Sequence, residues 1–140
     1  MKTKDLKTAS RNISGEDTKP AAENNYNMEP TMDVDFLKEV TGNDKVFRKE
    51  LFTLFLDSVQ SNITKMEKSL ADNDNDLWYM ASHSLKGAAG SIGAFQMAKI
   101  LEYAQSHSKE NLKNKTKIFD DAKAEFAKVA KIINDEISQY

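Results

Sequence analysis

The 140-residue chain has no cysteine, which excludes disulfides, thiol catalysis and cysteine-based metal sites. It has no apolar run near the roughly 20 residues that span a bilayer, and its first residues lack the apolar core of a secretory signal. Its net charge of −2 provides no general attraction to nucleic acid or to an anionic membrane. We therefore expect a soluble, cytoplasmic protein with neither nucleic acid nor membrane among its partners.

Proline is also scarce, and both prolines fall within residues 1–31. This segment has few large apolar side chains and is rich in Lys, Thr, Asn and Glu, which predicts a disordered N-terminal tail. The remaining residues, 32–140, are enough for one domain with a substantial core but not comfortably for two.

From Asp33 onward the apolar residues recur at three- and four-residue steps, and no strand pattern competes. The stretch "DVDFLKEVTG" predicts a short helix that ends at Gly42. Val34, Leu37 and Val40 fall on one face of this helix, which we expect to pack on the rest of the domain.

Four longer amphipathic helices are predicted after it. They cover about residues 43–73, about 75 into the glycine-rich stretch, about 95–108, and the segment from Phe119 to Ile137. The core-facing stripe expected for the first of them is Phe47, Leu51, Leu54, Phe55, Val59, Met66 and Leu70. Short connections favour antiparallel neighbours, so the expected fold is all-α, an up-down-up-down four-helix bundle with a short additional N-terminal helix.

The stretch "SHSLKGAAGSIGA", Ser82–Ala94, places three glycines in a predicted helix. Each interior glycine costs a helix about 1 kcal/mol relative to alanine. With about 100° of rotation per residue, His83 falls on the side opposite the apolar face, together with Tyr79, Lys86, Gly87 and Gly90. The apolar face is expected to consist of Leu77, Ala81, Leu85, Ala88 and Ile92, with Trp78 and Ala89 at its edges.

This arrangement favours a histidine that reacts with a partner. Gly87 and Gly90 remove side chains from the surface beside His83, so a bulky group or a partner backbone could approach the imidazole. Lys86, three residues beyond the histidine, would stabilise an anion attached to it, and a phosphoryl group is the obvious anion. Gly93 lies near the end of the helix and is expected to serve as a cap or turn.

Simpler explanations exist for each residue. An exposed histidine on a helix usually has no function, and helix glycines often allow close packing, although these two project away from the apolar stripe. A nucleotide-binding loop is not favoured, because such loops follow a strand and "GAAGSIG" matches neither G-x-x-x-x-G-K-[ST] nor G-x-G-x-x-G. A metal site on His83 and His107 has no third ligand at motif spacing, so we expect no metal site.

The segment "HSLKGAAGSIGA" resembles the active-site motif of histidine phosphotransfer (HPt) domains: His, one variable residue, Leu, Lys, Gly and then small residues up to Gly-Ala. Its flanks are similar as well. "TGNDKVFRKELFTLFLDSV" resembles the preceding helix of the family, "LADNDNDLWYMASHSLKG" resembles its acidic approach, and Leu101–Glu102 matches a pair usual in the next helix. The resemblance covers about residues 33–140.

The resemblance implies that His83 is phosphorylated, that Lys86 helps to hold the phosphoryl group and that Gly87 keeps room for it. Gln105 occupies a position where some relatives have a polar residue near the phosphohistidine. The partners implied are receiver domains of response regulators or hybrid sensor histidine kinases, which exchange phosphoryl groups through their aspartates. Tyr79, Gly87 and Gly90 would belong to the docking face.

A protein of this kind is a phosphoryl carrier without an ATP site, and we expect it to be a monomer with no cofactor of its own. The Mg²⁺ would come from the receiver. Two other interpretations remain open: a helical adaptor that binds receivers or kinases without carrying phosphate, and an HPt module that is part of a larger hybrid kinase.

Overall fold

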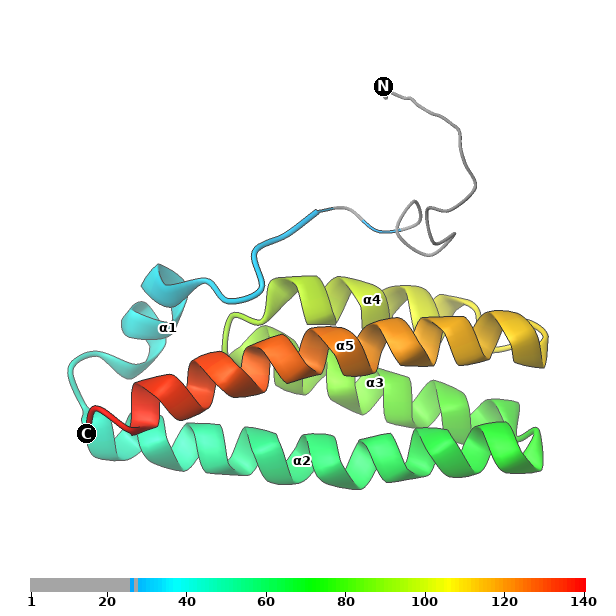
Figure 1. Ribbon diagram of the computed structural model, residues 1–140, viewed down its shortest axis with the longest axis horizontal. Coiled ribbons are helices and arrows are strands. Elements are labelled where there is room, and N and C mark those ends of the chain that lie inside the picture. The colour runs from blue at the N-terminus through cyan, green and yellow to red at the C-terminus, as the bar shows by residue number, and fades with distance from the viewer. Residues whose placement is uncertain (1–25, 27) are drawn as a thin grey trace.

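The computed structural model describes residue 26 and residues 28–140; residues 1–25 and 27, where most of the predicted tail falls, lie outside the described residues. The helices are α1 (Val34–Thr41), α2 (Lys45–Asp72), α3 (Asn75–Ser91), α4 (Phe95–Ser106) and α5 (Leu112–Ile137). Helices α2 to α5 lie side by side as an antiparallel bundle, and α1 packs at the end where α5 finishes (Figure 1). The described part of the chain contains no strand, so the predicted all-α bundle with a short leading helix is confirmed.

The helix starts follow from local side chains, with one exception. The N-cap side chains of α1, α2, α3 and α5 each accept a hydrogen bond from a backbone N–H of the first turn; they are Asp33, Asp44, Asp74 and Asn111. Helix α4 has Ala94 at this position and no side-chain cap. Its Gln96 N–H instead donates to the carbonyl oxygen of Pro30, at 3.1 Å, so an earlier part of the chain caps this helix.

This capping segment, residue 26 together with residues 28–33, is called the strap below. The Glu29 N–H donates to Gln96 Oε1 at 2.7 Å, and the Asp33 N–H donates to the carbonyl oxygen of Gly93 at 2.9 Å. Tyr26 packs edge-on against Tyr103, with ring centroids 5.3 Å apart. The described end of the predicted tail therefore packs on the bundle, whereas the domain boundary at residue 31 stays a prediction. Most of these contacts use the backbone, which composition does not reveal.

The core lies between the four long helices, and α2 contributes to it differently from the prediction. Phe55, Val59 and Met66 are buried as expected, but Phe47 and Leu54 are exposed. Leu51 and Leu70 are only half-buried, and the fully or nearly buried positions include Arg48, Phe52, Asn62 and Ser69. Apolar residues occur at adjacent positions along this helix, so a three-four period fits two neighbouring stripes equally well. The short helix behaves similarly, since Leu37 is buried whereas Val34 and Val40 are about half exposed.

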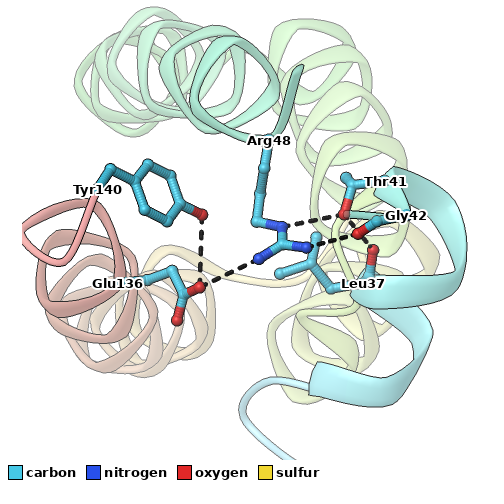
Figure 2. Close-up of polar contacts among 6 residues, drawn as sticks. All are labelled: Leu37, Thr41, Gly42, Arg48, Glu136 and Tyr140. Carbon is cyan, nitrogen blue, oxygen red and sulfur yellow. Dashed lines mark hydrogen bonds and ion pairs between the residues drawn. The ribbon is translucent and has the colours of Figure 1, made fainter. Parts of the chain in front are cut away.

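Arg48 is only 7% exposed and joins α1 to the rest of the bundle (Figure 2). Its Nε donates to Thr41 Oγ1 at 3.0 Å and its Nη2 to the carbonyl oxygen of Gly42 at 2.7 Å. Its Nη1 lies 3.2 Å from Glu136 Oε2, near the end of α5. The guanidinium, carried near the start of α2, thus satisfies acceptors at the ends of α1 and α5, which accounts for a charged side chain at this depth.

None of the helices in the described part of the chain has the length and apolar character needed to cross a bilayer.

Candidate functional site

The histidine helix, α3, is held against α4 by a buried tryptophan. Trp78 is fully buried, and its Nε1–H donates to the carbonyl oxygen of Ala104 at 2.8 Å. The Lys115 ammonium lies 4.9 Å from the centroid of the indole, and burial lowers the pKa of this lysine. Trp78 therefore lies at the centre of the packed face, where the helical wheel placed it at an edge.

The packed face of α3 is rotated slightly from the predicted one as a consequence. Ala81, Leu85 and Ile92 are buried as expected, and so are Ala89 and Ser82, whereas Leu77 and Ala88 are only half-buried. The rotation leaves His83 exposed, as predicted, because it lies on the opposite side of the helix.

His83 makes a polar contact with the neighbouring helix. Its Nδ1 lies 3.3 Å from Oε1 of Gln105 on α4, and Gln105 Nε2 donates to the hydroxyl of Tyr79 at 3.1 Å. The rings of Tyr79 and His83 are parallel, with centroids 6.4 Å apart. With the Gln105 amide in this orientation its Oε1 only accepts, so the contact corresponds to the tautomer that has its proton on Nδ1 and its lone pair on Nε2.

The two glycines beside His83 leave open space. A Cβ built on Gly87 or Gly90 would meet nothing within 4 Å outside its own helix segment. Close helix packing therefore does not explain either residue. Gly93 is different, because its φ is +82° and an added Cβ would lie 2.9 Å from the Asp33 carbonyl oxygen. Its predicted role at the helix end is confirmed, and the contact with the strap gives a second reason for glycine.

A groove of about 340 Å³ runs between α3 and α4 on the same side as His83. Its lining includes the predicted Lys86 and Gly90 from α3 and Phe95 and Ala98 from α4. It also includes three charged residues that the motif did not identify: Glu29, Lys99 and Glu102. One face of α3 carries both the groove and the histidine, because three- and four-residue steps lead from Gly90 through Lys86 and His83 to Tyr79.

Two exposed apolar side chains flank the histidine on α3. Tyr79 is 45% exposed and Met80 is 64% exposed. The sequence predicts Tyr79 on this side but does not single out Met80. Met80 lies three residues before His83, so the helical wheel already places the two side chains next to each other. Exposed apolar groups around a reactive residue are typical of a surface that a partner covers.

The second histidine does not join this site. His107 is the C-cap residue of α4, its Nδ1 lies 2.8 Å from the carbonyl oxygen of Tyr103, and its ring stacks on that of Tyr103 with centroids 3.8 Å apart. Within residue 26 and residues 28–140, no three side chains of His, Asp or Glu come together as a metal site.

Comparison with known proteins identifies the family. Residues 50–134, more than half of the chain and including His83, match the Hpt domain family. The fold is similar to the crystal structure of histidine-containing phosphotransfer protein B (HptB) from Pseudomonas aeruginosa PAO1, with a TM-score of 0.74 and 18% sequence identity over 81% of this chain and 99% of that chain. No curated protein matched. With the family match extending from α2 into α5, the chain belongs to the Hpt domain family.

Proposed function

We propose that Nε2 of His83 accepts a phosphoryl group from a receiver-domain aspartate and passes it to the aspartate of a second receiver. Histidine phosphotransfer in two-component phosphorelays is the function of the Hpt family, whose members interact with receiver domains and kinases. The observation that supports this residue assignment is the contact of Nδ1 with Gln105 Oε1, at 3.3 Å on an otherwise open helix face. It leaves Nε2 with its lone pair and without a partner among the described residues.

In the forward step the Nε2 lone pair attacks phosphorus, the N–P bond forms, and the P–O bond to the aspartate breaks. The aspartate leaves as a carboxylate. The imidazole keeps its Nδ1 proton and acquires positive charge, which the Gln105 carbonyl oxygen stabilises through the hydrogen bond. The reverse of these bond changes loads the next receiver, so the chain is a carrier and no proton has to be removed from it.

Lys86 supplies a cation for the phosphoryl oxygens in this proposal, since it lies three residues from His83 on the same face of α3. Gly87 and Gly90 supply the clearance, because neither glycine is needed for packing within the chain. Tyr79 and Met80 contribute apolar area to the docking face. In this proposal the receiver supplies both the aspartate and the Mg²⁺. The proposal also includes a monomeric state and a cytoplasmic location for the protein.

The proposal is tested by incubating the chain with ³²P-labelled phospho-receiver domains and Mg²⁺, comparing wild type with His83→Gln. His107→Gln is the matched control, because it removes the other histidine and leaves the groove intact. We expect acid-labile label on wild type and on His107→Gln, and none on His83→Gln. Equal label on His83→Gln would refute the assignment, and stable binding of a receiver without any transfer would favour the adaptor.

A further inference from the structure

The groove beside His83 has a wall that the four-helix bundle alone would not provide. Glu29 of the strap lines it together with Lys86 and Gly90 of α3. The strap is fixed there through the main chain, since the Glu29 N–H donates to Gln96 Oε1 at 2.7 Å and the Pro30 carbonyl oxygen accepts from the Gln96 N–H at 3.1 Å. The main chain at Glu29 is therefore held without any contact of its own carboxylate.

Two lysines and two glutamates line this groove, and they differ in the partners they have. Lys99 and Glu102 of α4 pair with each other at 3.5 Å. Lys86 is assigned to the phosphoryl group in the function proposed above. None of the ion pairs among the described residues involves the Glu29 carboxylate, so it is the charge that a partner can meet once Lys86 is engaged.

The groove also has the shape and lining that suit one kind of side chain. Gly90 and Ala98 give it an open, apolar floor, and Gly90 would accept an added Cβ without contact. Lysine and arginine lay their aliphatic part along apolar surface and keep the charged end in a polar setting. A basic side chain could thus lie over Gly90 with its charge at Glu29.

We propose that Glu29 is a specificity-determining residue for receiver docking, and that it selects receivers with a basic side chain at the edge of their docking surface. This inference rests on the proposed function, because it concerns the partner that delivers the phosphoryl group to His83. A charge pair at the rim of an interface acts mainly on association and on its salt dependence. Glu29 therefore affects KM for the phospho-receiver and leaves the chemical step unchanged.

The experiment uses the full chain and the receiver domains from the same organism, each loaded with ³²P-acetyl phosphate in the presence of Mg²⁺. The receivers that label wild-type His83 are kept, and KM and kcat are measured for wild type, Glu29→Gln and Glu39→Gln. Glu29→Gln preserves the backbone contacts of the strap, and Glu39 is an exposed residue of α1 that serves as the matched control. Thermal unfolding verifies that each variant is folded.

We expect Glu29→Gln to raise KM roughly two- to fivefold at low salt, with kcat unchanged, and the difference to disappear at about 0.5 M NaCl. Glu39→Gln should match wild type. An unchanged or lowered KM in Glu29→Gln, or a change in kcat alone, would overturn the inference while wild-type labelling upholds the proposed function. If no receiver labels wild type, the proposed function fails and this inference fails with it.

Discussion

The glycines of α3 allow a prediction in which stability and activity change in opposite directions. Gly87 is an interior position of α3 and Gly90 lies in its last turn, and a Cβ added at either would contact nothing, so alanine can replace either without strain. Replacing a helix-interior glycine by alanine gains about 0.5–1 kcal/mol, chiefly because the unfolded chain loses less conformational entropy on folding. For a domain of this size, that corresponds to an increase in Tm of roughly 2–5 °C for each substitution.

Gly93→Ala provides the internal control because the same substitution meets opposite conditions there. Its φ of +82° is unfavourable for alanine, and its Cβ would lie 2.9 Å from the Asp33 carbonyl oxygen and 3.2 Å from the Phe36 ring. We expect a loss of about 1–3 kcal/mol, from the left-handed backbone and from the displaced strap. The measurement is thermal unfolding by circular dichroism, with urea unfolding to give free energies.

The activity half of this prediction uses a larger side chain. Gly87→Leu should keep the fold, because the position is exposed, but should block transfer from a phospho-receiver by crowding the docking face beside His83. Direct chemical phosphorylation of His83 by phosphoramidate should continue, since this small donor needs little space. A lower Tm for Gly87→Ala, or unchanged receiver transfer in Gly87→Leu, would refute the argument that these glycines serve a partner and not packing.

Three further substitutions or truncations test the scaffold. Arg48→Met should lower the free energy of unfolding, measured in urea, by about 2–3 kcal/mol, because it removes the ion pair with Glu136 and the donor to two acceptors at the end of α1. Lys49→Met on the exposed side should have little effect. Burial raises the pKa of Asp121 above its ordinary 3.8, so the folded state binds the carboxyl proton more tightly than the unfolded state does. The contribution of Asp121 to stability therefore falls as the pH rises from 3.8 through the pKa of the folded state. The Tm of Asp121→Asn relative to that of wild type should therefore rise from pH 4 to pH 7. A relative Tm that rises as the pH is lowered would contradict this direction. A chain that begins at Asp33 should be less stable than one that begins at Tyr26 by about 1–2 kcal/mol, because α4 loses the Pro30 carbonyl oxygen as its cap. Equal stability of the two chains would show that the strap does not stabilise the fold.

The order and number of helices could be predicted because each signal is local. Asp44 and Asp74 are caps that stand directly before their helices, and Gly42 and Gly93 end theirs at positive φ. These features depend on a few neighbouring residues and therefore show in one sequence. The exposed position of His83 could also be predicted, since the apolar face of α3 is well separated from the opposite side.

The rotation of a helix about its axis could not be predicted to the same precision. Nothing in the α2 sequence alone indicates that Arg48 faces inward and Phe47 outward, because this depends on Glu136 and the end of α1 meeting at that point. The contact of Gln105 with His83 likewise depends on how α4 is aligned against α3. The family resemblance indicated Gln105, whereas periodicity could not.

The strap shows a third limit, which concerns contacts made by backbone atoms. Glu29 and Pro30 lie in a polar segment whose composition predicts a tail, yet the Pro30 carbonyl oxygen caps α4 and the Glu29 N–H donates to the Gln96 side chain. Any residue type has these groups, so composition gives no sign of such a contact. Only the uncapped start of α4 at Ala94 hints that another segment must supply an acceptor.

The position of the histidine has a kinetic consequence. His83 stands on a single open face, held by a helix that Trp78 anchors to α4, and the groove with Glu29 lies along that same face. If the proposed function holds, donor and acceptor receivers each bring an aspartate to the same Nε2, so they cannot both be bound at the moment of transfer. The relay should therefore follow ping-pong kinetics, with parallel double-reciprocal plots when donor and acceptor concentrations are varied, and excess unphosphorylated donor should inhibit competitively with the acceptor. Intersecting plots would require a ternary complex, which one imidazole on one face does not accommodate.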